Sequence, residues 1–404
     1  MSWWGRSSKV GARVIVVGAG LSGLAIARRL RVYGVDVTVV EAEPAIGGQC
    51  RSELVDGYLC DRGFHTVSPS GLSEVMDPSV LRAELRNLDP ILIVDKAGSR
   101  PAVDPVGEGF DDSVNARGEF ETHLFGVSPD ASWSSVLQRP DAPKERSLYA
   151  AASYDVMGRA SFNMTTEVLQ GWEGDDASVF SGGIGRLPAL LGCDVDVRLG
   201  VLVQSAARRN CRWVLETTAG PMEADQVVAA TPASFSHGLL AAQGATTRWS
   251  SWWFAAPTAP TSSAAVWVTL DRGGAVAHVC VLSNVAPDRS PGSTALISAT
   301  CLGDLPAAVV AKELAEIYGV DTSAWRAVAH YPLEIPDPVG LSGPLRMSTW
   351  ELEAGFWQVP TVHGHVESIR RGEALGDRLA KVIGALNWGG TRRLIKERLS
   401  WEEW

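Results

Sequence analysis

Two short runs of β-branched residues near the N-terminus flank an amphipathic segment. Residues 13–17 read Arg-Val-Ile-Val-Val, and residues 35–40 read Val-Asp-Val-Thr-Val-Val. Runs of this length are typical of parallel strands that are buried on both faces. Residues 24–33 carry apolar side chains at helical spacing, and Gly34 follows them as a helix-ending residue. The pattern predicts a strand–helix–strand unit at the start of an α/β fold.

Shorter patterned segments continue through the rest of the chain. Strands are predicted where apolar residues run or alternate, at 91–95, 264–270, 276–282 and 294–300. Residues 306–318 have helical spacing and predict a helix. The stretch 250–270 is uncharged, but its prolines and many hydroxyl side chains argue against a membrane span, and we expect a loop followed by a strand. Residues 330–340 are rich in proline, and we interpret them as a return segment.

Three glycines occupy the turn between the first predicted strand and helix. Gly18 permits a tight turn, Gly20 lets the backbone approach a pyrophosphate, and Gly23 lets the helix pack closely on the strand. The helix N-terminus then presents free N–H groups to the phosphates. Glu41 ends the second strand, where an acid binds a ribose hydroxyl. This unit therefore predicts a site for NAD or FAD. Its predicted cofactor contacts are Gly18, Gly20, Leu21, Ser22, Gly23, Glu41 and Ala42.

A second glycine pair follows Glu41 and distinguishes the two dinucleotides. Gly47 and Gly48 offer another place where backbone can approach a cofactor closely. An NAD site needs no such loop at this point. The pair therefore favours FAD over NAD.

Together these motifs resemble the N-terminal signature of the monoamine oxidase, protoporphyrinogen oxidase and phytoene desaturase flavoproteins. UDP-galactopyranose mutase, a related flavoenzyme, is similar in its Gly-Gly and Gly/His segments. The resemblance implies an α/β fold of the glutathione-reductase-like, amine oxidase type, in which a Rossmann-type FAD-binding domain carries an inserted α+β substrate domain. The residues that match the signature are Gly18, Gly20, Gly23, Glu41, Gly47, Gly48, Gly57, Asp61, Gly63 and His65.

Later segments extend this resemblance. Residues 181–191 are similar to the glycine-rich stretch with which the family returns to its flavin domain, and residues 196–234 are similar to the segment after it. The chain departs from the family where Gln49 replaces an arginine, and where Gly364-His365 stands in place of Gly-Asp. The further FAD contacts implied by the resemblance are Gly47, Gly48, Gln49, Arg51, Phe64, His65, Val203, Ala230, Ser368 and Ile369.

The resemblance also implies two discontinuous domains. We assign the FAD-binding domain to residues 11–70, 178–234 and 345–386. The substrate domain takes residues 71–177 and 235–344, with helices expected at 132–140 and 145–157. Residues 387–404 are charged and predict a C-terminal surface helix.

Flavin chemistry requires few catalytic side chains, because the cofactor accepts the hydride. His65 is the predicted catalytic residue, since the resemblance places it facing the flavin ring; the alternative is that it only packs its loop. Trp252, Trp253 and Trp357 are predicted to wall an aromatic substrate pocket, and the alternative is that they belong to the core. No metal site is predicted, because the cysteines are scattered.

Composition narrows the class of partner. A net charge of −10 argues against a nucleic-acid partner, and the resemblance implies a small-molecule substrate. Residues 1–9 lack an apolar signal segment, and we expect a cytoplasmic protein with free thiols. A homodimer is left open.

The function implied by the resemblance is that of an FAD-dependent oxidoreductase. Such an oxidase or desaturase would remove a hydride from a C–N or C–C bond of a small, bulky or hydrophobic substrate, for example in secondary metabolism. Two alternatives stay open. One is a flavin-bound isomerase or cyclase without net redox change, and the other is a non-catalytic protein with a degenerate cofactor cleft.

Overall fold

A computed structural model describes most of the chain. The described residues are 11–95, 98–101, 177–231, 246–269, 274–336, 351–359 and 364–384. The helices expected at 132–140, 145–157 and 387–404 lie outside these residues.

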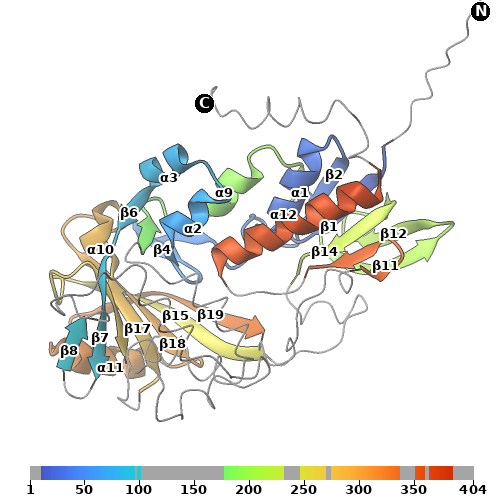
Figure 1. The fold of residues 1–404 in the computed structure, drawn as a ribbon. Coiled ribbons are helices and arrows are strands. Elements are labelled where there is room, and N and C mark those ends of the chain that lie inside the picture. The colour runs from blue at the N-terminus through green and yellow to red at the C-terminus, as the bar shows by residue number, and fades with distance from the viewer. Residues whose placement is uncertain are drawn as a thin grey trace, which may run out of the picture.

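A six-stranded sheet forms the first half of the fold (Figure 1). Its strands are parallel except for the last, which pairs antiparallel with its neighbour. The predicted strand–helix–strand unit is confirmed as β1, α1 (Leu21–Val32) and β2, with β1 and β2 in the middle of the sheet. In order across the sheet the strands are β10 (Val197–Arg198), β2 (Asp36–Val40), β1 (Arg13–Val17), β14 (Gln226–Ala229), β21 (Phe356–Gln358) and β20 (Glu351–Glu353).

The two faces of this sheet are covered differently. One face packs against helices α1, α9 (Arg186–Gly192) and α12 (His365–Val382). The opposite face packs against an antiparallel meander of three strands, in a second core that contains Trp213. Burial on both faces explains why β1 and β2 are almost entirely β-branched. The meander strands are β11 (Val203–Arg209), β12 (Arg212–Thr217) and β13 (Met222–Ala224).

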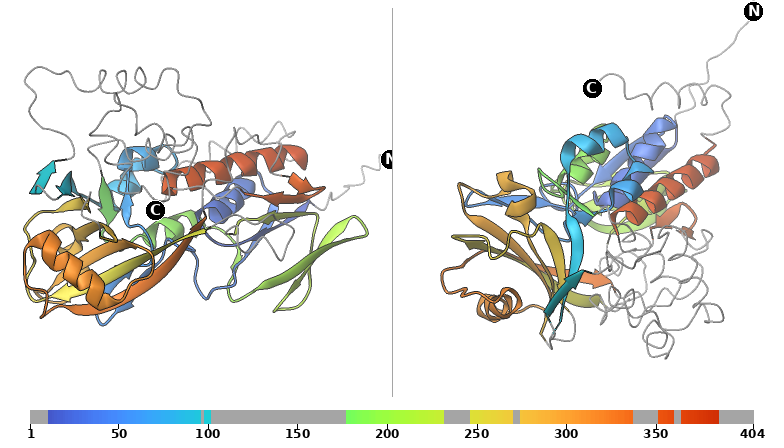
Figure 2. Two further views of the ribbon diagram at one scale, coloured as in Figure 1. Left: turned by 90° about the horizontal axis from the view of Figure 1, so that it is seen from below. Right: turned by 60° about the vertical axis from the view of Figure 1, so that its left-hand side comes forward.

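A mixed seven-stranded sheet forms the other half (Figures 1 and 2). One of its faces packs against α11 (Ala307–Tyr318), and the other packs against the segment that leaves the first sheet. In order across the sheet the strands are β19 (Arg326–Pro336), β15 (Thr246–Ala256), β18 (Ala295–Leu302), β17 (Val276–Val281), β16 (Ala265–Thr269), β7 (Asp89–Asp95) and β8 (Gly98–Pro101).

Small elements join the two sheets. The hairpin of β3 (Ser52–Val55) and β4 (Tyr58–Asp61) leads from the first sheet to a three-stranded sheet. That sheet consists of β5 (Thr66–Val67), β9 (Ser178–Phe180) and β6 (Leu85–Asn87). The short helices of this part of the chain are α2 (Pro69–Ser73), α3 (Pro78–Glu84), α10 (Leu282–Val285) and a 3-10 turn at Pro287–Arg289.

One local prediction is wrong, and a second segment is more regular than its composition suggests. Residues expected as a loop at the start of 250–270 instead continue β15, which pairs along its length with both β18 and β19. The expected proline-rich return at 330–340 begins as the second half of β19. Proline is tolerated there because β19 is the edge strand of its sheet, where one row of N–H groups needs no partner.

The predicted strands at 91–95, 264–270, 276–282 and 294–300 and the predicted helix at 306–318 are confirmed. The division into two domains stays a prediction. Leu72 and Leu81, from the segment assigned to the substrate domain, pack in the core of the six-stranded sheet. Among the described residues, every helix is too short or too polar to cross a bilayer.

Candidate functional site

The turn between β1 and α1 contains two glycines that the fold itself requires. A Cβ on Gly23 would lie 2.0 Å from the carbonyl oxygen of Gly18. Gly18 has a φ of +103°, and its Cβ would lie 2.5 Å from the carbonyl oxygen of Ala230. Neither position accepts a side chain, so these two glycines say nothing about a ligand.

Gly20 differs from its neighbours because no internal contact explains it. It has ordinary extended backbone angles, and a Cβ placed on it would meet nothing within 4 Å. It is the N-cap of α1, and no side chain caps this helix. The first turn of α1 therefore presents backbone N–H groups and the positive end of the helix dipole to the space beside Gly20.

The second glycine pair closes on the same space. The Gly47 N–H donates to the Ala19 carbonyl at 2.7 Å, which fixes the loop against the turn. A Cβ on Gly48 would have the Gly20 Cα as its nearest neighbour, at 3.6 Å. Two bare backbone segments thus flank an uncapped helix N-terminus, which fits the pyrophosphate of a dinucleotide.

Glu41 lies at the end of β2 beside this cradle. Its carboxylate accepts hydrogen bonds from the backbone N–H groups of Ala19 at 2.7 Å and Glu43 at 2.9 Å. Each carboxylate oxygen retains acceptor capacity beyond these bonds. Glu41 can therefore hold the glycine turn and still accept a ribose hydroxyl, while Ala42 beside it is exposed.

The remaining predicted contacts approach from other segments. The Ala230 N–H donates to the Val17 carbonyl at the end of β14, next to the glycine turn. The Ser22 hydroxyl donates to the Ser368 carbonyl at 3.0 Å, which joins α1 to α12. Val203 and Ile369 are buried in the two cores on either side of the sheet.

Gln49 and Arg51 stand where the resemblance expects a single arginine. Gln49 is exposed, and its backbone carbonyl oxygen would lie 2.8 Å from a Cβ on Gly63. The guanidinium of Arg51 is 3.4 Å from the Glu43 carboxylate and 3.6 Å from that of Glu53. The charge of Arg51 is therefore balanced by two acids, and its Cγ would lie 3.1 Å from a Cβ on Gly47.

Helix α12 directs its N-terminus at the loop that follows β4. Gly364 precedes it with a φ of +94°, and no side chain caps the helix. Its close approach to α1 depends on Gly372 and Gly376, because Cβ atoms there would lie 2.6 Å from the Ser22 carbonyl oxygen and 2.8 Å from the Arg29 Cβ.

His65 lies between the two sheets, in the loop between β4 and β5. Its side chain is 3% exposed, and its ring centroid is 5.7 Å from that of Trp253. Its Nε2 is 3.4 Å from the Ser298 hydroxyl, and its buried Nδ1 has no hydrogen-bond partner among the described residues. Burial lowers the pKa of His65 to about 4 despite the nearby Asp61 carboxylate, so the imidazole is neutral at pH 7.

Two further histidines adjoin His65, and we call His65, His278 and His365 the histidine cluster. His278 comes from β17, and its ring centroid is 5.7 Å from that of Phe64. Burial, followed by the neighbouring His65, lowers the pKa of His278 to about 3. Burial also lowers the pKa of His365, at the start of α12, to about 4, although the Asp61 carboxylate and a hydrogen bond with the Phe64 backbone oppose the shift.

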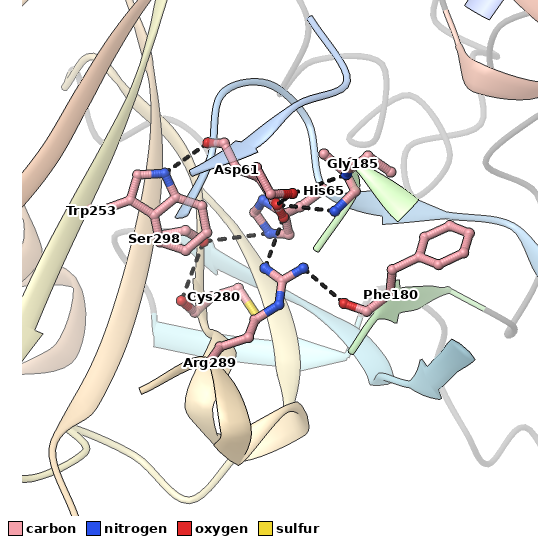
Figure 3. Close-up of polar contacts among 10 residues, drawn as sticks. Asp61, His65, Phe180, Gly185, Trp253, Cys280, Arg289 and Ser298 are labelled. Atoms are coloured by element: carbon pink, nitrogen blue, oxygen red, sulfur yellow. Dashed lines mark hydrogen bonds and ion pairs between the residues drawn. The ribbon is translucent and has the colours of Figure 1, made fainter. Parts of the chain in front are cut away.

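A buried ion pair fixes the loop that carries His65 (Figure 3). The Arg289 guanidinium donates to the Asp61 carboxylate at 2.8 Å, and both side chains are 0% exposed. Asp61 also accepts from the Ser52 hydroxyl and the Ile184 N–H, and its backbone carbonyl accepts from the Trp253 indole at 2.9 Å. This network connects the hairpin, the β9 segment and the seven-stranded sheet at one point.

Known proteins are similar to this chain both in the sequence around the glycine turn and in the fold. Residues 16–78 match the model of the NAD(P)-binding Rossmann-like domain. Mitochondrial protoporphyrinogen oxidase from Nicotiana tabacum is 50% identical over 58 residues, which are 14% of this chain and only 12% of that protein. The structure of cyclohexylamine oxidase from Brevibacterium oxydans IH-35A covers 92% of this chain and 99% of its own, with a TM-score of 0.67 and 14% identity. The chain has the same fold as this amine oxidase. A CLA-producing fatty acid isomerase from P. acnes has the same fold, with a TM-score of 0.69, 14% identity, and coverage of 91% of this chain and 98% of its own.

Within this amine oxidase fold, the three predicted pocket tryptophans occupy different places. Trp253 lies on the inner face of the seven-stranded sheet beside His65. Trp252 lies on the opposite face, in the core under α11. Its ring stacks on that of His330, with the two ring centroids 4.1 Å apart. Trp357 is fully buried in the core of the six-stranded sheet. A role in substrate binding stays a prediction for all three, and the geometry favours Trp253.

Several residues at the junction of the amine oxidase fold are absent from the predicted set. They come from the seven-stranded sheet and the 3-10 turn beside it, whose position relative to the six-stranded sheet no local motif reveals. One signal was available, because β18 carries the hydroxyl residues Ser298 and Thr300 although it is buried on both faces. The missed residues are Trp249, His278, Arg289 and Ser298.

Proposed function

We propose that this protein is an FAD-dependent oxidoreductase that removes a hydride from a C–N or C–C bond of a small organic substrate. The observation that carries the proposal is the cradle formed by Gly20 and Gly48 at the uncapped N-terminus of α1. FAD, when bound, supplies the hydride acceptor of the reaction.

The chain's own residues would divide the work of binding. The first turn of α1 would bind the pyrophosphate, and Glu41 would accept a ribose hydroxyl. The N-terminus of α12 would favour negative charge near the histidine cluster, because the positive end of its dipole lies there. His65 and Phe64 would face the reacting part of the cofactor, as the resemblance implies.

The surroundings of His65 support an uncharged, bulky substrate. The histidine cluster is neutral at pH 7, and the charges of Asp61 and Arg289 are paired with each other. Trp253 adds an aromatic ring to the same region. Among the described residues the lysines are Lys312 and Lys381, both exposed on helices, so none of these could bind an acid beside His65.

A redox-neutral flavin isomerase is the second candidate. The fold shared with the P. acnes fatty acid isomerase supports it, because that similarity covers nearly the whole of both chains. A binding protein with a vacant cleft is a third reading. The replacement of the family's arginine by Gln49 and of its Gly-Asp by Gly364-His365 is consistent with this third reading. Failure of the protein to bind FAD would support it.

Anaerobic mixing of the purified protein with candidate substrates separates the first two functions. Protoporphyrinogen, cyclohexylamine and a fatty acid form a suitable first panel, because proteins that share the motif or the fold are named for them. Bleaching of the flavin without an added reductant would support an oxidoreductase. Turnover only after prior reduction of the flavin, without net consumption of electrons, would contradict it and support the isomerase.

A further inference from the structure

The two ring nitrogens of His65 have different environments. Nε2 faces the Ser298 hydroxyl of β18 at 3.4 Å. Nδ1 is buried and has no partner among the described residues. Buried polar atoms are nearly always hydrogen-bonded, so an orphaned ring nitrogen calls for an explanation.

The neighbours of Ser298 determine which nitrogen carries the proton. The Ser298 hydroxyl is also 3.4 Å from the Cys280 carbonyl oxygen of the adjacent strand β17 (Figure 3). A carbonyl oxygen can only accept, and a serine has one proton to donate. All three groups are satisfied when Ser298 donates to the Cys280 carbonyl and its oxygen accepts from the Nε2–H of His65. In this arrangement the lone pair of the neutral ring lies on Nδ1.

The ring is held firmly in this orientation. Ser298 and Cys280 are each 1% exposed, and their strands pair at these two residues. Trp253 packs against the imidazole, while its indole N–H is used on the Asp61 carbonyl.

The charged and titratable groups around the ring do not compete for its nitrogens. The Asp61 carboxylate is engaged by Arg289, Ser52 and Ile184. The other neighbours, His278 and His365, are neutral at pH 7, and neither makes a hydrogen bond with His65 among the described residues.

We propose that Ser298 is a positioning residue that holds His65 as the Nε2–H tautomer, so that Nδ1 accepts a hydrogen bond from an N–H or O–H group of a bound ligand. The identity of that ligand rests on the proposed function, and it is either the isoalloxazine of FAD or the organic substrate. The tautomer itself depends only on Ser298 and Cys280.

Side-chain NMR of protein labelled with 15N-histidine tests the tautomer directly. The His65→Asn variant assigns the His65 resonances by their loss. Wild-type protein should show the Nε2–H pattern for His65, with the Nδ1 shift of an unprotonated nitrogen. Ser298→Ala should give an averaged mixture of tautomers, and Ser298→Thr should restore the wild-type pattern because it keeps the hydroxyl.

Ser250→Ala is the matched control. Ser250 is a fully buried serine of the same sheet, and its hydroxyl donates to Gly303, so this variant should leave the His65 pattern unchanged. A wild-type Nδ1–H tautomer, or an unchanged pattern in Ser298→Ala, would overturn the proposal.

Two successive additions to the labelled protein identify which ligand donates the hydrogen bond to Nδ1. FAD is added to the apoprotein, and then the compound that bleaches the flavin in the anaerobic assay is added. A shift of the Nδ1 resonance at the first addition assigns the donor to the cofactor, and a shift only at the second assigns it to the substrate. No shift at either overturns the acceptor role. Failure to take up FAD counts against the proposed function alone, because the tautomer of the free protein still decides the role of Ser298.

Discussion

The ion pair between Asp61 and Arg289 gives the sharpest test of how the two halves of the molecule are joined. Arg289 donates to the Asp61 carboxylate and to the Phe180 carbonyl, each at 2.8 Å, and neither side chain of the pair is exposed. Replacing Arg289 with methionine removes both bonds while keeping a side chain of similar length. Asp61 is then left as a buried charge with only the donors from Ser52 and Ile184.

The expected cost follows from this burial. Removing one partner of a buried pair typically destabilises a protein by about 3–5 kcal/mol, because the other charge loses its compensation. Asp61→Asn should cost a similar amount, since it leaves Arg289 unpaired. The double variant Asp61→Asn/Arg289→Met contains no buried charge, so it should lose about 2 kcal/mol less than the sum of the two single losses.

Urea unfolding followed by tryptophan fluorescence measures these differences, and Trp253 reports on the site because its indole contacts Asp61. Arg326→Met is the matched control. It removes an ion pair with Asp56 whose side chains are 52% and 66% exposed, so the unfolding midpoint should not move. Additive losses in the double variant, or a midpoint in Arg289→Met equal to that of the control, would refute the reasoning.

Three further predictions concern the cofactor cleft and its supports. Gly20→Val should abolish flavin binding while the protein still folds, because a Cβ there would meet nothing within 4 Å. Gly11→Val, at an equally open glycine, should keep its flavin, and equal flavin content in both variants would contradict the cradle. Gly372→Val should lower the free energy of unfolding, measured in urea, by about 1–3 kcal/mol through its clash with α1, and an unchanged free energy of unfolding would contradict the packing of α12. Because the folded pKa of His65 is about 4 and the unfolded value is about 6.5, the unfolded state binds the extra proton between these values, so stability falls as the pH falls through this window. At pH 5 His65 lowers the free energy of unfolding by about 2 kcal/mol. In His65→Asn the free energy of unfolding should therefore fall less between pH 7 and pH 5 than in wild type, and an equal fall would count against a buried neutral imidazole.

The half of the fold around the six-stranded sheet was readable from the sequence because much of its information is local. Gly18 has a positive φ, Gly23 is required by its contact with the Gly18 carbonyl, and the strand–helix–strand unit around them follows from short periodic runs. The same holds for β17, β18 and α11, each of which has a clear period of its own.

The inserted sheet was harder to read because its strands depend on distant partners. Thr246–Ala256 forms a strand because β18 and β19 pair with it from both sides, and both lie far along the chain. Arg289 illustrates the same limit at the site, since it pairs with a residue 228 positions away and stands in a short turn without a motif. Ser298 lies in a strand that the sequence predicted, but only the fold places its hydroxyl beside His65.

The absorption spectrum of the purified protein, recorded before and after heat release of bound material, tests the central claim most directly. The account predicts the visible bands of an oxidised flavin, and a released compound that is identified as FAD by its mass. A colourless protein that gains no flavin spectrum when FAD is added, or one that releases a nicotinamide dinucleotide instead, would contradict the account.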